Sequence, residues 1–144
     1  MNSLILLLSF PLVFAKGYTI KKMVFDNGKT VEVEIADTVL KRTKGLMNRT
    51  SLDQNKGMLF VFNEATKQSF WNKNTFIPLD LAYFDKDMVL KEIYPLEAVS
   101  MMEKVQDTKT YPSKCLCQYV LEVNQGWFKR NKVKIGSKFQ LKEK

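Results

Sequence analysis

Residues 31–35 of this 144-residue chain read Val-Glu-Val-Glu-Ile, and this alternation limits the possible folds more than any other feature of the sequence. Successive side chains of a β-strand point to opposite faces, so the pattern predicts a strand with one buried and one solvated face. Asn27-Gly28 stands just before it, and this dipeptide favours the positive φ angles of a tight hairpin turn. We therefore expect a β-hairpin whose first strand covers residues 18–25.

Residues 58–62 read Met-Leu-Phe-Val-Phe and follow Gly57. A short run that is apolar on both faces is typical of a strand in the interior of a sheet that is covered on each side. We therefore expect a central strand here. Other apolar segments bounded by turn residues predict further strands at residues 69–75, 81–84, 89–94, 115–123 and 138–141.

Two short helices are expected, at residues 39–47 after the capping pair Asp37-Thr38 and at residues 127–130 after Asn124. Residues 97–112 are expected to form a long loop. Short strands with two small helices predict an α+β domain that is predominantly antiparallel β, built as a small closed or half-open barrel. Closing the sheet would remove its exposed edges.

Residues 1–15 contain no charged side chain. The apolar run is shorter than the ~20 residues that a membrane-spanning helix needs, but it has the length of a signal-peptide core. Val13 and Ala15 supply the small residues of a cleavage site, so we expect a secretory leader removed after Ala15. A single domain of residues 16–144 would then be exported to the periplasm or beyond, without a transmembrane anchor. Because no Lys or Arg precedes the run, a buried strand or an uncleaved anchor is the alternative.

Histidine is absent from the sequence. This absence excludes Ser-His-Asp and Cys-His sites, and any zinc site that uses imidazole. Acid–base chemistry near neutral pH would need an Asp, Glu, Lys, Tyr or Cys with a shifted pKa. No phosphate-binding or dinucleotide-binding motif occurs, and we expect no cofactor.

The chain carries 23 Lys and Arg against 15 Asp and Glu, a net charge of +8. A basic exported protein is attracted to anionic surfaces such as phospholipid head groups, acidic glycans or acidic proteins. A solvated lysine-rich surface explains the same composition. Nucleic acid is not an expected partner, because of the predicted export and because no recognition motif is present.

Residues 70–80 combine a large aromatic ring, an ammonium, an amide, a hydroxyl and a carboxylate. In a strand, Trp71 and Lys73 would share one face. Lys73 and Asn74 can hydrogen-bond an anionic or carbonyl ligand, with Trp71 as an apolar wall. The alternative is purely structural: Trp71 belongs to the core, Asn74 and Thr75 bond the backbone of a turn, and Lys73 pairs with Asp80.

Several motifs occur in a characteristic order: Gly45-Leu46-Met47-x-Arg49, Gly57-Met58-Leu59-Phe60-Val61-Phe62, Phe70-Trp71-x-Lys73-Asn74-Thr75-x-Ile77-Pro78-Leu79-Asp80, then Tyr119-Val120-Leu121-Glu122 with Gly126 and Gly136. This order resembles the bacterial and archaeal family known as domain of unknown function 192, over roughly residues 31–141. The resemblance implies a compact β-rich domain, commonly exported, with no assigned biochemical role. By the family pattern, the candidate ligand-binding residues are Arg49, Trp71, Lys73, Asn74 and Asp80.

The chain departs from that family pattern in two places. Asn72 stands where the family usually has Met, and Gly136-Ser137 stands where it usually has Gly-Asp. A role for that family acid therefore cannot be transferred to this chain.

Cys115-Leu116-Cys117 lies outside the family pattern. In an oxidising compartment two thiols tend to form a disulfide, but two residues spaced i and i+2 in a strand have Cα atoms ~7 Å apart, near the limit for bridging. A strained bridge would be oxidising and suit a redox role. Thiolates together with Met101 and Met102 could instead hold Cu(I). Two small buried residues, or a simple local bridge, are the plainer alternatives.

Three functional hypotheses follow. The first is a non-catalytic binding module of the cell envelope, whose anionic or carbonyl-bearing ligand or partner contacts the five candidate residues. The second is a small enzyme that uses Lys73 or Asp80 as acid or base. The third is a thiol redox or Cu(I)-binding protein based on Cys115 and Cys117. No other metal site is expected.

Overall fold

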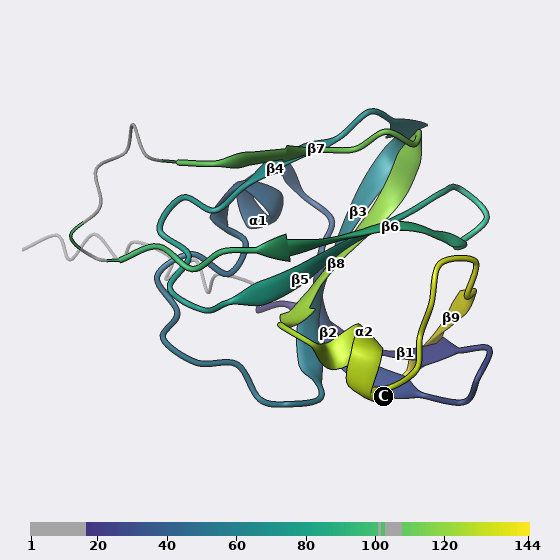
Figure 1. Ribbon diagram of the computed structural model, residues 1–144. Helices are drawn as coiled ribbons and strands as arrows, with labels where there is room; N and C mark the ends of the chain where they lie inside the picture. Colours follow the sequence, from purple (N-terminus) through teal and green to yellow (C-terminus); the bar gives the residue numbers. More distant parts are fainter. Residues whose placement is uncertain (1–16, 101, 103–107) are drawn as a thin grey trace, which may run out of the picture.

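The computed structural model describes residues 17–100, 102 and 108–144 (Figure 1). The expected leader, residues 1–15, lies outside this range, as does Met101. The elements in chain order are β1 (Thr19–Phe25), β2 (Thr30–Ala36), α1 (Val39–Lys44), β3 (Lys56–Thr66), β4 (Ser69–Trp71), β5 (Leu79–Phe84), β6 (Leu90–Leu96), β7 (Thr110–Pro112), β8 (Cys117–Asn124), α2 (Trp127–Arg130) and β9 (Phe139–Glu143). Neither helix of the described chain is long and apolar enough to cross a membrane.

Seven of these strands form one sheet in the order β6-β5-β8-β3-β2-β1-β9, and β4 pairs with β7 in a second, small sheet. All pairs are antiparallel except β2 with β3. These two run parallel because the connection through α1 carries the chain back to the end of the sheet at which β2 begins. The expected fold class, α+β with predominantly antiparallel strands and two short helices, is confirmed.

The large sheet is not closed into a barrel. Its two outer strands approach each other at one end only, where an isolated antiparallel bridge joins Val89 and Lys138. There the Leu90 backbone nitrogen donates to the Ser137 carbonyl at 2.8 Å. The half-open form of the expected barrel is therefore the one observed.

The central strand β3 is buried on both faces, as predicted from its apolar sequence. Leu59 packs into the core on one face of the large sheet, which contains Trp127 and Phe128 of α2. Met58 and Phe60 point to the other face. That second core also includes residues from β4, β7 and the segment after α1. Figure 1 shows α2 and the β4–β7 pair on opposite sides of the large sheet.

The strand expected at residues 69–75 ends at Trp71, so the expected shared face of Trp71 and Lys73 along one strand is wrong. The cause is Asn72, whose buried amide oxygen accepts from the Lys109 nitrogen at 2.8 Å and whose amide nitrogen donates to the Glu97 carbonyl at 3.1 Å. These bonds turn the chain, and Asn74 follows with a φ of 49°.

Both helices differ in detail from the prediction. Thr38 caps α1 by accepting from the Lys41 nitrogen, but the helix stops at Lys44 because Gly45 turns the chain with a φ of 49°. The residue that precedes α2 is Gly126, not Asn124. Asn124 ends β8 and donates its side-chain amide to the Leu52 carbonyl at 2.7 Å. The loop expected at residues 97–112 also contains strand β7.

Candidate functional site

A groove of about 260 Å³ lies between α1 and β4. We call it the α1–β4 groove; it is lined by Arg42 and Thr43 of α1, Phe62 of β3, Gln68, and Ser69, Phe70 and Trp71 of β4. The lining is continuous along the short strand β4, so one wall is a strand edge and the other is a helix. The groove therefore presents aromatic rings beside polar groups, as ligand sites commonly do.

Trp71 forms the exposed aromatic wall of the α1–β4 groove. Its side chain is 46% exposed, so the structural alternative that placed it in the core is wrong. The Lys73 ammonium lies 5.4 Å from the centroid of the Trp71 ring. The predicted Lys73–Asp80 ion pair of that alternative is also absent among the described residues. An ammonium over an indole face is electrostatically favourable, and here it keeps a positive charge close to the groove.

Arg42 supplies a fixed cation on the helix side of the groove. Its Nη1 donates to the Val61 carbonyl at 2.8 Å, and its guanidinium carbon lies 4.9 Å from the centroid of the Phe62 ring. Arginine that is bonded at one nitrogen and stacked on a ring keeps its remaining donors in a set direction. The groove thus has a positively charged side that suits an anionic or carbonyl group.

A second, smaller hollow of about 30 Å³ opens next to the groove and shares Arg42, Thr43, Phe70 and Trp71 with it. Its lining also includes the Gly45-Leu46-Met47 turn, Phe60, Thr75 and Glu122. We call it the Glu122 hollow. It extends the groove inward to the surface of strand β8.

Glu122 is the one acidic residue in the lining of this hollow. Its side chain is only 5% exposed, and it lies in β8 between Met58 of β3 and Leu81 of β5. Burial raises the pKa of Glu122 to about 8. Within the described part of the chain, no donor hydrogen-bonds its carboxyl group. Glu122 is therefore mainly a neutral carboxylic acid at pH 7, with unused hydrogen-bonding capacity.

The position of Glu122 depends on a close approach of β3 and β8. Gly57 of β3 allows it, because a Cβ at that position would lie 2.5 Å from the Glu122 carbonyl oxygen and 2.8 Å from Val123. Only a residue without a side chain fits there. Gly57, which lies in β3 before the apolar run, thus has a role in building the hollow.

Sequence reasoning did not select Glu122 as a site residue, although it belongs to the Tyr119–Glu122 motif. A signal was present: Glu122 interrupts an otherwise apolar segment, Val120-Leu121-Glu122-Val123. An acid within a strand that is buried on both faces is unusual enough to indicate a special role. Which face it occupies, and what surrounds it there, depends on contacts that are distant in sequence.

Of the five candidate residues, Trp71 and Lys73 are brought together at the groove. Asn74 accepts at its carbonyl from the Asn48 nitrogen at 2.8 Å, and this bond ties the Lys73–Asn74 turn to the segment that carries Arg49. Arg49 makes a two-bond ion pair with Glu34, at 2.6 and 2.8 Å. The hydrogen bond to Glu34 raises the pKa of Arg49.

Asp80 has a different environment. It is 8% exposed, and its carboxylate accepts from the Gly126 nitrogen at 2.9 Å, at the start of α2. Burial raises the pKa of Asp80, while hydrogen bonds from the backbone of Gly126 and Phe128 oppose that rise. Asp80 is not among the residues that line the α1–β4 groove. Its observed contacts hold α2 against the sheet.

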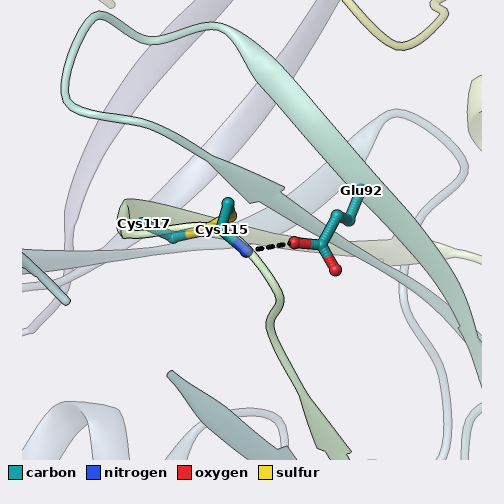
Figure 2. Close-up of side chains that lie close together, drawn as sticks. All are labelled: Glu92, Cys115 and Cys117. Carbon is teal, nitrogen blue, oxygen red and sulfur yellow. Dashed lines mark hydrogen bonds between the residues drawn. A yellow bond between two sulfur atoms is a disulfide. The ribbon is translucent and has the colours of Figure 1, made fainter. Parts of the chain in front are cut away.

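A disulfide joins Cys115 and Cys117, with 5.6 Å between the Cα atoms. The expected separation of ~7 Å is wrong because β8 begins at Cys117, so Cys115 lies before the strand. In Figure 2 the Glu92 carboxylate points at the Cys115 backbone nitrogen, which donates to it at 2.6 Å. The Lys114 nitrogen also donates to Glu92, at 2.8 Å.

The Glu92 carboxylate and the two sulfur atoms lie within 4.8 Å of one another, a spacing that could suit a metal ion. Burial works to raise the pKa of Glu92, but hydrogen bonds from Tyr94 and from the backbone of Cys115 and Lys114 outweigh it, and the pKa is lowered. Sulfur atoms joined in a disulfide are not thiolate ligands. Of the two methionines in the Cu(I) hypothesis, Met102 is 91% exposed and Met101 lies outside the described residues.

Two solved structures resemble this chain over most of its length. One is a protein from Sinorhizobium meliloti described as a candidate transcription regulator, 31% identical, with a TM-score of 0.74 over 87% of this chain and 95% of that chain. The other is a protein of unknown function from Novosphingobium aromaticivorans, also 31% identical, with a TM-score of 0.72 over 85% of this chain and 84% of that chain. A search of curated proteins found no match.

The family comparison agrees with the motifs and with the fold. The model of the family DUF192, described as "Uncharacterized ACR", matches residues 22–141. That range contains every element from β2 to α2, together with the groove and the Glu122 hollow. The chain therefore belongs to the DUF192 family, whose biochemical role is unassigned.

Proposed function

We propose that this protein is a non-catalytic binding module that holds an anionic or carbonyl-bearing ligand in the α1–β4 groove. The observation that carries this proposal is Trp71, a large aromatic side chain that is 46% exposed at the wall of a groove. Tryptophan usually buries most of its surface, in the core or against a partner. A ligand lying along β4 would cover the exposed indole.

The charges around the groove support the ligand class. Arg42 and Lys73 both place cationic groups next to Trp71. Cationic and aromatic groups together favour a ligand with a flat apolar body and an oxygen-bearing end. Such a ligand would meet the Trp71 ring and the Arg42 guanidinium at once.

The arrangement supports binding more than catalysis. The enzyme hypothesis needs Lys73 and Asp80 to act on the same substrate. Lys73 lies over Trp71, whereas Asp80 is bonded to the start of α2 and does not line the groove. Acid–base catalysis needs both groups within hydrogen-bond reach of the reacting atoms.

A location in the cell envelope is part of the proposal. The apolar residues 1–15 have the composition of a secretory leader. The Cys115–Cys117 disulfide also supports it, because disulfides persist mainly in oxidising compartments. A thiol redox role for this pair is the second candidate function, favoured by the presence of the bridge itself.

Nuclear magnetic resonance of the folded domain tests the binding proposal directly. The chain has two tryptophans, and Trp127 is fully buried, so its indole signal is an internal control for that of Trp71. Acetophenone and benzoate serve as a carbonyl and an anionic aromatic probe. We expect a saturable shift of the Trp71 indole signal and of the Arg42 and Phe70 amides, with the Trp127 signal unchanged.

Two variants complete the test. Trp71→Ala should abolish the shifts at Arg42 and Phe70, because the apolar wall is gone. Ile135→Ala, at another exposed apolar side chain outside the groove lining, should leave them intact. Absence of saturable shifts with both probes, or identical shifts in the Trp71→Ala variant, would overturn the proposed function.

A further inference from the structure

We propose that Glu122 is a protonated acid that donates a hydrogen bond to an acceptor oxygen of the ligand in the α1–β4 groove. This inference rests on the proposed function and names the chemical group that the site selects. The ligand would carry a ketone, amide, ester or carboxylate oxygen at the end of a flat apolar body.

The shape of the site places Glu122 within reach of such a ligand. The Glu122 hollow shares Phe70, Trp71 and Arg42 with the groove, so a ligand stacked on Trp71 can extend into it. Its volume of about 30 Å³ has room for roughly two non-hydrogen atoms. A carbonyl group fits that space, whereas a ring does not.

The hydrogen-bonding state of Glu122 indicates a missing partner. The described residues give its carboxyl group no hydrogen bond, yet no fully buried side-chain oxygen among them lacks a partner, so the carboxyl oxygens of this 5% exposed residue keep accessible surface at the hollow that it lines. A carboxyl group that reaches only a small hollow depends on what enters the hollow for its hydrogen bond, and leaving it without one there is destabilising. A ligand oxygen in the hollow would supply the partner.

The charged groups around the hollow decide which partner fits. Arg42 and Lys44 line it from the side of α1, while β3 and β4 contribute apolar and aromatic side chains. On β5, Tyr83 donates its hydroxyl to the Tyr111 carbonyl, and burial together with nearby acidic groups, Glu122 among them, raises the pKa of Tyr83. Asp80, also on β5, is opposite Val123, and alternation places it on the other face of the sheet.

The chemistry follows from this environment. Desolvation keeps Glu122 neutral at pH 7, and a neutral carboxylic acid donates one hydrogen bond through its O–H group. The cations Arg42 and Lys44 disfavour a positively charged ligand. An oxygen that only accepts hydrogen bonds is therefore the preferred partner below the pKa of Glu122, and ionisation of Glu122 removes the donor.

Matched planar probes test the inference on wild-type protein labelled with ¹³C at the glutamate carboxyl carbons. Acetophenone only accepts hydrogen bonds, and benzamidinium only donates them. Titrations are made at pH about 6.5 and about 9.5, on either side of the Glu122 pKa. At the lower pH we expect acetophenone to shift the Glu122 carboxyl signal and benzamidinium to have little effect. At the higher pH the affinity for acetophenone should fall about tenfold, the effect of one lost hydrogen bond.

Two variants separate this role from a packing role. Glu122→Gln keeps an N–H donor at every pH, so it should bind acetophenone at both pH values with equal affinity. The Met side chain of Glu122→Met has a similar length but no donor. This variant should bind acetophenone about tenfold more weakly than wild type at the lower pH. Equal acetophenone binding by wild type at both pH values, or by wild type and Glu122→Met, would overturn the inference.

The two proposals fail in distinguishable ways. If the Trp71 signal saturates while the Glu122 carboxyl signal never moves, the groove binds ligand and only the role of Glu122 is wrong. If neither signal responds to any probe, both proposals are wrong.

Discussion

The ammonium of Lys73 lies 5.4 Å from the centroid of the Trp71 indole ring, although strand β4 ends between the two residues. The contact is therefore made by a turn and not by a shared strand face. It leaves the indole exposed while placing a positive charge over it. The pair thus combines an apolar surface and a cation at one wall of the α1–β4 groove.

We expect Lys73→Met to weaken binding of benzoate about threefold to fivefold and to leave acetophenone binding unchanged. Methionine keeps the apolar stem of the side chain but removes the charge, whose exposed contribution is about 0.5–1 kcal/mol. Titration followed at the Trp71 indole signal measures both affinities. Lys86→Met, in an exposed turn, is the control and should change neither. An equal loss of affinity for both probes would show that Lys73 does not act through its charge.

The raised pKa of Glu122 predicts that stability falls as pH rises. The unfolded carboxyl titrates near 4.5 and the folded one near 8, so the folded state binds the proton more tightly. Protonated Glu122 makes its full contribution to the free energy of unfolding below pH ~4.5. Between there and pH ~8 this contribution, up to roughly 5 kcal/mol, is lost. Urea unfolding of wild type and Glu122→Gln across this range measures it. Parallel pH profiles for the two proteins would contradict the prediction.

Gly57→Ala should destabilise the fold by about 3 kcal/mol, because the new methyl group would overlap the Glu122 carbonyl oxygen. The strands β3 and β8 would have to separate, which should also shift the Glu122 carboxyl signal. Gly17→Ala is the matched control, since a Cβ at Gly17 meets nothing within 4 Å. Chemical denaturation of both variants gives the comparison. If Gly57→Ala left the stability unchanged, the strands β3 and β8 would be able to move apart freely.

Asp80→Ala should lower stability by about 1–2 kcal/mol without changing probe binding. The substitution leaves the Gly126 nitrogen without its acceptor at the start of α2. Thermal unfolding measures the first effect and the Trp71 titration the second. Weaker binding of benzoate or acetophenone by a folded Asp80→Ala variant would restore Asp80 to the ligand site.

Export predicts two chemical signatures on protein purified from whole cells. Mass spectrometry should find an amino terminus at Lys16, because the expected cleavage follows Ala15. Alkylation without reductant should leave Cys115 and Cys117 unmodified, since both are in the disulfide. An intact Met1 on a cytosolic pool with two reactive thiols would contradict the export hypothesis.

The local sequence correctly predicted those strands whose formation depends on residues close together in the chain. The alternation at residues 31–35 predicted β2, and the doubly apolar residues 58–62 predicted the buried centre of β3. The end of β4 could not be predicted in the same way. It depends on Asn72 bonding to Lys109 and Glu97, which are 37 and 25 residues away along the chain.

The site was predicted less well than the fold for the same reason. Trp71 and Lys73 are two positions apart in sequence; Trp71 lines the groove, and the Lys73 ammonium lies over its ring. Glu122 becomes a candidate only when β3 and β5 flank it and the turn after α1 covers it. Asp80 became a candidate ligand residue because its hydrogen-bond partner is not visible in the local sequence. That partner, the Gly126 nitrogen at the start of α2, lies 46 residues further along the chain.

The segment that contains Lys138 and β9 contacts both outer parts of the large sheet. β9 pairs with β1, and Lys138 forms the bridge to Val89, next to β6. β9 pairs with residues 21–25 on the outer side of β1, and the residues just before β9 bond Leu90 at the start of β6. Removing residues 138–144 would leave the outer side of β1 with unpaired backbone groups and would break the bridge at Val89, and an unpaired strand edge is a template for pairing with further molecules. We therefore expect residues 138–144 to protect the sheet from edge-to-edge pairing between molecules.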